Sequence, residues 1–440
     1  MSTAAVATRV GRELNSICGA EHVTEAPAER ILGCAPGVAV RPGSAQEIAA
    51  ILRFANQNNL VVAPAGGLTQ QEAGNAPSQI DILLYTSRLT ETEHYDPADL
   101  TVGIGAGCTV AHLCHDISKD GLLFAPDPPL WERATIGGLL ATGITGPRRH
   151  GYGALRDYCI GVRFVTGDGR IGKGGGRVVK NVAGYDMMKL LIGSWGTLAV
   201  ITGASFKLFP YPRNSRTFVA CFPNLSDAMA YRDRVLRSPL DPMCLELLSP
   251  QASALLTPGS PAAAFWSICV RGAGSDAVLA RFRSELGSAV AHEMEDEKET
   301  AFWRKVADFP ALARERDPDS LLMTIMAPLC DVRRVLDVTD EVAAASGFTV
   351  AAAGRVGHGN LFVSLSPTVG RQLTKTNYTK VMATLNEQLP RDASLTVLHC
   401  PPEARPDIPM LRTPTHAGSM RAVKHALDPK DILNRGRFSL

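Results

Sequence analysis

Residues 126–162 read PDPPLWERATIGGLLATGITGPRRHGYGALRDYCIGV, and residues 177–210 read RVVKNVAGYDMMKLLIGSWGTLAVITGASFKLFP. Glycines recur in the first stretch at irregular intervals, at Gly137, Gly138, Gly143, Gly146, Gly151 and Gly153. Glycine is favoured where the backbone takes a positive φ or approaches another group closely, and one tight turn needs only one or two of them. The stretch therefore predicts a pocket lined by backbone, suited to a large, flat, anionic ligand.

A second glycine turn precedes this stretch and follows a compact β-α-β unit at 38–63. The unit is predicted from a strand at 38–40, a capping box that begins at Ser44, an amphipathic helix and a strand at 60–63. The turn itself is Pro64-Ala65-Gly66-Gly67-Leu68-Thr69. Free N–H groups at the carboxyl end of a strand form a nest for phosphate. An ordinary loop is an equal alternative for this turn taken alone.

The overall composition is that of a packed soluble protein of roughly two or three domains. The 440 residues are 45% hydrophobic and 20% charged, and the formal net charge is only +2. This balance offers no electrostatic case for nucleic acid or an acidic membrane as a partner. No apolar run approaches the roughly 20 residues of a membrane helix. Residues 1–14 lack the pattern of a signal peptide.

The ten cysteines are scattered through apolar segments, and none forms a CxxC motif. Buried free thiols are typical of this distribution. It indicates a reducing cytoplasm, and it argues against an iron–sulfur cluster or a structural zinc site within the chain.

Two further patterns suggest function, but each has a simpler structural explanation. Gly103, Gly105 and Cys108 occupy the glycine positions of a dinucleotide fingerprint before a predicted helix at 109–119. The cysteine weakens the match, so we interpret the run as tight strand–helix packing. His112 and His115 lie about one helical turn apart, and without a third ligand nearby a surface or packing role is favoured over a metal pair.

Strands and helices continue to alternate after Pro212. Several adjacent strands suit antiparallel pairing, which predicts an α+β domain of two split β-α-β units side by side. The charged segment 293–308 is expected to form a solvated helix. The chain closes with a helix from Ser419 and the motif DPKDILNRG at 428–436.

The order of the motifs resembles that of the FAD-linked oxidases of the p-cresol methylhydroxylase/vanillyl-alcohol oxidase type. The motifs are the β-α-β unit, the Pro-x-Gly-Gly turn, DLTVGIGAG, DPP…ATIGG, GPRRHGYG, RDYCIGV, KNVAGYD, GSWGTLAVI and DPKDILNRG. They cover residues 38–210 densely, whereas the resemblance over 213–400 is looser. Within the family, the chain is most similar to the FAD-binding (E) subunit of bacterial glycolate oxidase.

The resemblance implies an α+β fold in which two lobes clamp FAD beneath a cap. It implies an N-terminal extension at 1–37, a FAD-binding domain of two α+β subdomains at 38–212, a ferredoxin-like cap/substrate domain at 213–405, and a C-terminal segment at 406–440 that returns to the FAD domain. The expected FAD contacts come from the glycine turn that begins at Pro64 and from both quoted stretches. They are Pro64, Ala65, Gly66, Gly67, Leu68, Thr69, Gln70, Asp127, Pro128, Ala134, Thr135, Gly137, Gly138, Ala141, Thr142, Gly146, Arg148, Gly151, Tyr152, Gly153, Gly196, Leu198, Val200 and Ile201.

The phosphates would be held by backbone N–H groups of the turn and by the hydroxyl of Thr69. Arg148 or Arg149 would offset the phosphate charge, or would instead form a surface salt bridge. The turn departs from the family's usual run of three glycines at Leu68, which crowds it.

Some relatives bond their flavin covalently through a histidine in this turn. No histidine lies at 60–75, so we expect non-covalent FAD. His150 and Cys159 are the remaining candidates for covalent attachment.

Relatives that oxidise 2-hydroxy acids often carry Gly-His-x-Gly-Asp-Gly-Asn-x-His in the cap, where the histidines bind a divalent metal and the substrate. Residues 354–362 correspond to this motif and read GRVGHGNLF, with Arg355 and Phe362 at the two metal-ligand positions. Neither side chain ligates a metal, so we expect no metal here. Arg355 would either clamp a substrate carboxylate or pair with a neighbouring acid.

The sequence is compatible with three functions. The first is a subunit of a glycolate oxidase-type complex that oxidises a small 2-hydroxy acid or relays its electrons through FAD. Its partners would be a sister flavin subunit and an iron–sulfur subunit, and the loss of the metal histidines favours the relay. The second is a stand-alone FAD oxidase or dehydrogenase that uses Arg355, His358 and Asn434 around the flavin. The third is a flavin-free structural subunit, an option that Leu68 leaves open. The expected location is the cytoplasm, with peripheral attachment to the inner membrane through partner subunits as an option.

Overall fold

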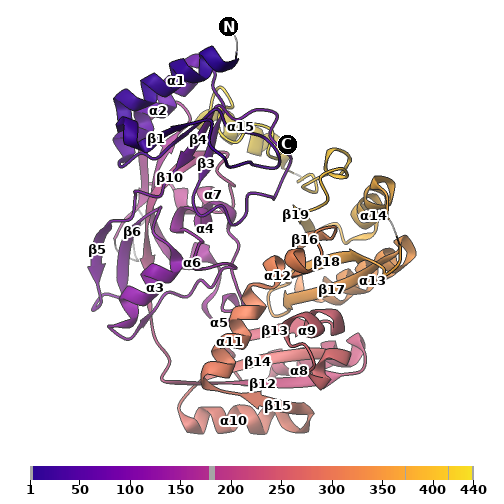
Figure 1. Ribbon diagram of the computed structural model, residues 1–440. Coiled ribbons are helices and arrows are strands. Elements are labelled where there is room, and N and C mark those ends of the chain that lie inside the picture. Colours follow the sequence, from indigo (N-terminus) through magenta and orange to yellow (C-terminus); the bar gives the residue numbers. More distant parts are fainter. Residues whose placement is uncertain (1–2, 178–183, 372, 415, 439–440) are drawn as a thin grey trace. The chain divides into compact units, whose positions relative to one another are not determined.

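The computed structural model describes residues 3–177, 184–371, 373–414 and 416–438. The motif KNVAGYD at 180–186 therefore lies partly outside the described residues. The chain forms two compact units. The first unit comprises Met1–Thr145, Ala154–Tyr211 and Thr413–Leu440, and the second comprises Gly146–Gly153 and Pro212–Arg412. Figure 1 colours both units along the sequence.

The first sheet of the first unit has the strand order β1-β2-β4-β3, with β2, β4 and β3 parallel and β1 antiparallel to β2. Its strands and helices are α1 (Thr3–Cys18), β1 (Val23–Glu25), β2 (Val38–Val40), α2 (Ala45–Asn58), β3 (Val62–Ala65) and β4 (Ile82–Tyr85). The predicted capping box begins α2, because the Glu47 N–H donates to Ser44 Oγ at 3.1 Å. Asn59 ends the helix with a φ of 55°. The predicted β-α-β unit is thus present.

The N-terminal segment packs into this unit and is not a separate extension. Val10, Leu14 and Cys18 on α1 are buried in the same apolar cluster as the inner face of α2. Helices α1 and α2 lie beside the first sheet in Figure 1. The apolar face of α1 gains its stability from this burial, as an amphipathic helix does.

The second sheet of the first unit is antiparallel, with the order β5-β6-β10-β8-β9. Its strands are β5 (Thr92–Asp96), β6 (Thr101–Gly105), β8 (Cys159–Thr166), β9 (Ile171–Gly175) and β10 (Ala199–Lys207). The helices around it are α3 (Val110–Ser118), α4 (Ile136–Thr142), α6 (Leu155–Tyr158) and α7 (Met187–Leu191), and a short pair joins β7 (Leu122–Leu123) to β11 (Phe209–Pro210). Strand β10 of this sheet comes from the second of the two stretches quoted above, residues 177–210.

The fingerprint-like glycines pack closely, as predicted, but their partner is a turn and not the following helix. A Cβ on Gly105 would overlap the carbonyl of Leu89, and one on Gly107 would overlap the carbonyl of Thr86. The N–H groups of Gly105 and Gly107 also bond to carbonyls in this region, of Glu91 and Leu89. Glycine is required here because two backbone segments touch.

The second unit contains an eight-stranded sheet with the order β15-β12-β14-β13-β17-β18-β16-β19. The sheet consists of two halves, β15-β12-β14-β13 and β17-β18-β16-β19, which have the same strand order read in opposite directions. The halves meet where β13 pairs with β17. The strands are β12 (Asn214–Phe222), β13 (Cys244–Leu248), β14 (Trp266–Gly274), β15 (Val290–Met294), β16 (Leu321–Met326), β17 (Phe348–Arg355), β18 (Asn360–Pro367) and β19 (Ser394–His399). This is the predicted pair of split β-α-β units.

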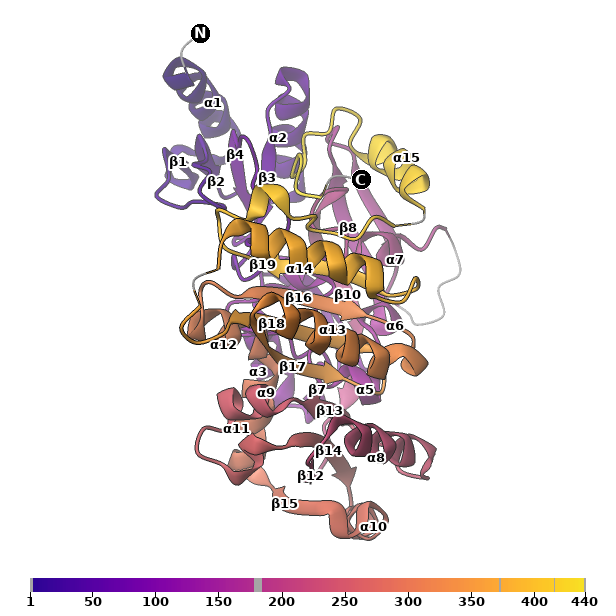
Figure 2. The ribbon, with the colours of Figure 1, turned by 90° about the vertical axis from the view of Figure 1, so that its right-hand side faces the viewer.

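The crossover helices of the two halves are α8 (Leu225–Arg237), α10 (Asp276–Leu286), α13 (Val332–Ser346) and α14 (Lys375–Gln388). Figure 2 shows α13 and α14 side by side in front of their strands. The remaining α-helices among the described residues are α5 (Arg149–Tyr152), α9 (Pro250–Leu256), α11 (Asp296–Ala307), α12 (Phe309–Arg316) and α15 (Ala417–Leu427).

The prediction of a solvated helix over 293–308 is wrong in two respects. Residues 290–294 form β15, and α11 buries one face. Glu299 is only 1% exposed. Its carboxylate is compensated there, because Arg271 pairs with it at 2.9 Å and the Thr217 hydroxyl donates to it at 2.7 Å. Trp303 Nε1 in turn donates to Thr217 at 2.7 Å. One carboxylate of a charged helix is therefore buried together with the polar groups that pair with it.

The boundaries of the units also differ from the expected domains. Residues 146–153 belong to the second unit, where the Gly151 N–H donates to the Met243 carbonyl at 3.0 Å. A Cβ on Gly151 would lie 2.9 Å from Met243 Cα, so this glycine serves packing against β13. The C-terminal return to the first unit begins at Thr413 and not at residue 406.

Candidate cofactor site

A pocket in the first unit collects most of the predicted FAD contacts. Five segments line it: the glycine turn after β3, the residue that follows β4, helix α4 with its N-cap, the start of β10 with the loop before it, and the C-terminal segment. The lining residues are Pro64, Ala65, Gly66, Gly67, Leu68, Thr69, Gln70, Gln71, Thr86, Thr135, Gly137, Gly138, Ala141, Thr142, Trp195, Gly196, Ala199, Val200, Ile201, Asn434 and Arg437. The fold thus brings both quoted stretches to one cavity wall.

The glycine turn carries backbone donors that the protein itself does not use. The N–H groups of residues 66–69 donate no hydrogen bond within the described part of the chain. Unpaired N–H groups at the end of a strand suit an anion, because each costs free energy unless it is bonded or solvated. The turn therefore fits the pyrophosphate of FAD on the chemistry of its donors.

Gly66 and Gly67 hold this turn against the start of α4. A Cβ on Gly66 would overlap Thr135 Oγ1, and one on Gly67 would overlap the carbonyl of Arg133. Thr135 caps α4 by accepting the Gly138 N–H at 3.2 Å. The two glycines are therefore needed for close packing as well as for access to the backbone.

Leu68 fits the turn more easily than the sequence suggested. Its φ is 56°, in the left-handed region, and its side chain packs partly against the buried cluster that contains Ala65 and Tyr85. The left-handed conformation costs a non-glycine residue about 1–2 kcal/mol. Apolar packing offsets part of this cost, so the turn keeps the conformation that a glycine would take.

Helix α4 presents small residues to the pocket. Gly137 faces inward, because a Cβ there would lie 3.0 Å from that of Ala106. Gly138 is open, with only Thr135 Oγ1 within 4 Å of a Cβ placed on it, at 3.2 Å. A large side chain at Gly138 would project into the pocket without entering the core.

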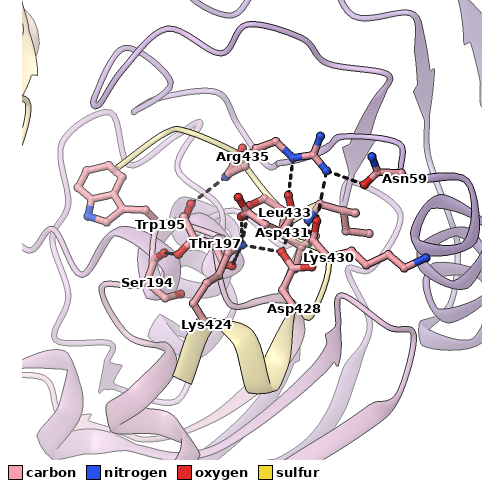
Figure 3. A network of polar contacts seen from close by, with 12 residues as sticks. Asn59, Ser194, Trp195, Thr197, Lys424, Asp428, Lys430, Asp431, Leu433 and Arg435 are labelled. Atoms are coloured by element: carbon pink, nitrogen blue, oxygen red, sulfur yellow. Dashed lines mark hydrogen bonds and ion pairs between the residues drawn. The ribbon is translucent and has the colours of Figure 1, made fainter. Parts of the chain in front are cut away.

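The C-terminal segment closes the pocket, and one lysine anchors it. Lys424 Nζ reaches Asp428 Oδ2 at 2.5 Å, Asp431 Oδ1 at 2.8 Å, and the carbonyls of Thr197 at 2.7 Å and Leu433 at 3.1 Å. Asp428 is 1% exposed, and it also accepts the N–H groups of Ile432 and Leu433. Figure 3 shows this network between the segment and the loop at 194–197.

Asn434 lies in this segment and lines the pocket. Its side-chain amide donates to the Trp195 carbonyl at 2.9 Å, and its backbone N–H donates to the Val62 carbonyl at 2.9 Å. Its φ is 44°, a region that asparagine tolerates better than most residues. Asn434 thus ties the C-terminal segment to two other walls of the site.

Several predicted contacts do not line the pocket. Asp127, Pro128, Ala134 and Leu198 lie in the first unit outside the lining set. Gly146, Arg148, Gly151, Tyr152 and Gly153, together with Arg149, fall in the second unit, because the chain crosses into it after Thr145. Five lining residues were not predicted, namely Gln71, Thr86, Trp195, Ala199 and Arg437. Adjacency to predicted residues would have found three of these, but not Thr86 or Arg437.

His150 and His358 meet within the second unit. Their rings are 5.2 Å apart and nearly perpendicular, and a Cβ on Gly357 would overlap the His150 ring. Burial, reinforced by the neighbouring His358, lowers the pKa of His150 to about 4. His150 is therefore a neutral imidazole at physiological pH.

Cys159 is buried on β8 in the first unit. Burial raises the pKa of its thiol to about 12. The thiolate is the nucleophilic form, so this thiol is inert.

Arg355 is buried in the sheet of the second unit, with 1% of its surface exposed. Its Nε lies 3.4 Å from Oε1 of Glu246, and its guanidinium stacks over the Phe362 ring at 4.6 Å. This is the arrangement expected if Arg355 pairs with a neighbouring acid. A clamp for a substrate carboxylate would need an accessible guanidinium, so the structure speaks against that alternative.

The three residues proposed for catalysis are divided between the units: Asn434 is in the first, and Arg355 and His358 are in the second. Across the described ranges, no group of three or more His, Cys, Asp and Glu side chains is arranged to hold a metal ion. Within the same ranges, no helix has the length and apolar character needed to cross a membrane.

Two family models match the chain. The FAD binding domain matches residues 36–174, and the C-terminal domain of the FAD linked oxidases matches residues 211–389 and 403–438. Both models describe FAD-linked proteins, so FAD is the cofactor and the flavin-free alternative is set aside.

Among curated proteins, the D-lactate dehydrogenase of Archaeoglobus fulgidus is 41% identical over 49% of this chain, which spans about half (48%) of that relative. Glycolate oxidase subunit GlcD of Bacillus subtilis is 26% identical, in a match that covers 92% of this chain and 89% of that subunit. Glycolate oxidase subunit GlcE of Escherichia coli is 41% identical, in a match that covers 28% of this chain and 35% of that subunit.

A solved structure of p-cresol methylhydroxylase with substrate bound has a TM-score of 0.74 to this chain at 14% identity. The match covers 98% of this chain and 96% of that one. At this identity the likeness shows the fold alone, and it confirms the predicted fold class.

Proposed function

Because the chain belongs to the family of FAD-linked oxidases and is an FAD-linked oxidoreductase, we propose that its substrate is a small 2-hydroxy acid. The relatives named for glycolate and for D-lactate share this chemical class, an alcohol beside a carboxylate. The observation that carries the proposal is the pocket of the first unit, with unused backbone donors at the turn and small side chains on α4.

Bound FAD would accept the hydride that leaves the α-carbon of the substrate. The chain's own residues would hold the cofactor in place. The N–H groups of residues 66–69 and the Thr69 hydroxyl would bind the pyrophosphate, and Gly138 and Gly196 would leave room for its flat groups. Asn434 would keep the C-terminal wall closed through its bond to Trp195.

We further propose that the chain works as a subunit of a glycolate oxidase-type complex. Its relatives include both subunits of that name: the D type matches along most of the chain, and the E type matches a shorter stretch at higher identity. Either kind of subunit is compatible with these matches. Since the cysteines form no CxxC motif, electrons would leave through a partner that carries an iron–sulfur cluster.

The buried Arg355 supports a relay role for this subunit. Arg355 and Phe362 lie at the positions where relatives that oxidise 2-hydroxy acids often carry metal-binding histidines. Here the two side chains stack on one another beside Glu246. A sister flavin subunit would then oxidise the substrate and pass its electrons on. This assignment rests on the chemistry of three packed side chains.

The histidine pair favours a second candidate, a stand-alone FAD-linked dehydrogenase of another alcohol or hydroxy acid. A neutral imidazole can accept the hydroxyl proton that a 2-hydroxy acid loses on oxidation. His150 is held neutral, and His358 contacts it on the turn between β17 and β18.

Anaerobic mixing of the purified protein with glycolate, D-lactate and D-2-hydroxyglutarate separates the candidates. The flavin absorbance bands should be present in the purified protein. Rapid bleaching of the isolated chain would establish a stand-alone enzyme, whereas bleaching only after the partner subunits are added would establish the relay. Purified protein that carries no flavin and takes up none would refute the proposal. Gly138→Leu, which fills the pocket from an open position, serves as the cofactor-free control.

A further inference from the structure

We propose that Arg437 is the cationic ligand of the FAD pyrophosphate. The inference deepens the proposed function and rests on the proposed placement of FAD in the pocket of the first unit. Among the described residues that line this pocket, Arg437 alone carries a charged side chain. The bound pyrophosphate would bring two negative charges, and the backbone donors of the turn carry only partial charges.

Arg437 is buried where it faces the pocket, with 4% of its surface exposed. A guanidinium keeps its charge at every relevant pH, and its planar fork suits phosphate oxygens. The oxygens of a bound diphosphate would accept hydrogen bonds from this fork within the cavity.

The guanidinium lies at the phosphate end of the pocket. Arg437 Nη2 donates to the carbonyl of Gln71, two residues beyond Thr69, where the turn's unused N–H groups end. A backbone hydrogen bond also joins these two segments, because the Asn75 N–H donates to the Arg437 carbonyl at 2.8 Å. A Cβ on Gly74 would lie 3.2 Å from Arg437 Cγ. The arginine and the turn therefore form one site.

The fold holds Arg437 at this position from both sides. On one side, the Arg437 N–H donates to the Asn434 carbonyl at 3.0 Å, and Asn434 is itself bonded to Trp195 and Val62. On the other side, the Phe438 ring packs 5.3 Å from that of Trp195. Preorganisation of this kind reduces the entropy that a ligand must overcome on binding.

Arg148 and Arg149, the arginines first considered for this charge, belong to the second unit. Arg435 lies two residues before Arg437, but its guanidinium bonds to the Asp431 carbonyl and to Asn59 Oδ1, as Figure 3 shows. Arg435 does not line the pocket. It therefore provides a matched control, being an arginine of the same segment with the same charge.

FAD binding to flavin-depleted protein tests the assignment, with the dissociation constant read from flavin fluorescence. Arg437→Gln should weaken FAD by about 10- to 100-fold, the range for charge-assisted hydrogen bonds. Arg437→Lys should recover part of this loss, and Arg435→Gln should change affinity less than about threefold. ADP should compete with FAD for the wild-type site, and Arg437→Gln should weaken ADP by a similar factor. The salt dependence of binding should fall in the same variant.

The reduction potential of the bound flavin distinguishes the two ends of the cofactor. Arg437→Gln should leave the potential and the visible spectrum unchanged, because the guanidinium is placed at the phosphates. A shifted potential with unaltered ADP affinity would overturn the inference and place the charge at the isoalloxazine ring. An unchanged affinity for FAD would overturn it as well.

Gly138→Leu separates this inference from the placement of FAD. If it abolishes FAD binding while Arg437→Gln does not, the pocket holds FAD and only the role of Arg437 is refuted. If Gly138→Leu binds FAD as tightly as the wild type, the placement itself is refuted. Thermal unfolding of each variant, followed by circular dichroism, shows that the fold is kept.

Discussion

Asn434 donates its side-chain amide to the carbonyl of Trp195, 2.9 Å away, across 239 residues of sequence. This bond joins the C-terminal segment to the loop that precedes β10, and both line the same pocket. The pocket is therefore complete only when the end of the chain has returned to the first unit.

Lys424→Met should destabilise the first unit and weaken FAD. The substitution leaves the buried Asp428 without its cation and frees the carbonyls of Thr197 and Leu433. Removing one partner of a buried ion pair costs about 3–5 kcal/mol. Urea unfolding should show this loss, whereas Lys430→Met, which removes one exposed bond to the Asn56 carbonyl, should cost under about 1 kcal/mol. Equal losses in the two variants would contradict the anchoring role.

Arg355→Met should lower the free energy of unfolding by about 3–5 kcal/mol, because the buried Glu246 would lose its ion pair with the guanidinium. The double variant Arg355→Met with Glu246→Met should recover most of that stability, as apolar replacements of buried pairs often do. A double-mutant cycle in urea measures the coupling free energy. If Arg355→Met instead keeps its stability and raises the KM for a hydroxy acid, Arg355 contacts the substrate.

The second unit should lose stability as the pH falls below about 6.5, the ordinary pKa of histidine. The folded-state pKa of His150 is lowered to about 4, so the unfolded chain binds the proton first. Stability from this group is present above about pH 6.5 and is lost progressively towards pH 4, by about 3 kcal/mol in all. Unfolding free energies at pH 7 and pH 5 measure the loss.

His150→Gln should flatten this pH dependence, because the variant has no imidazole to protonate. His112→Gln should not, since His112 is exposed on α3. A pH profile that is the same in His150→Gln and the wild type would show that other groups control acid stability.

FAD should leave the protein on acid precipitation. No histidine lies at 60–75, and burial keeps the Cys159 thiol protonated with a pKa of about 12. We expect all of the yellow colour in the supernatant after trichloroacetic acid, as measured by absorbance of both fractions. Flavin that stays in the pellet would show a covalent bond, and peptide mapping would then identify the attachment residue. His150→Gln is the first variant to examine in that case.

Local sequence patterns were sufficient for many of the elements and for the glycine turn. The capping box at Ser44 and the turn after β3 each depend on neighbours within a few residues, so their chemistry is visible in the sequence. The alternation of strands and helices after Pro212 likewise predicted two split β-α-β units, because side-chain periodicity reports the local element. The placement of the glycine turn and of residues 134–142 at the cofactor came instead from the resemblance to the FAD-linked oxidases.

Only the tertiary structure decided which distant residues meet. Arg437 reaches Gln71 across 366 residues, residues 146–153 pack against β13 in the second unit, and Arg355 is buried against Glu246 and Phe362. No periodicity encodes such contacts, since they depend on the packing of whole elements. The sequence by itself therefore determined the elements, the glycine turn and the kind of cofactor. The charge that faces the cofactor, and the surroundings of the changed metal-ligand positions, were decided by the fold, because burial and pairing are properties of packed neighbours and not of local order.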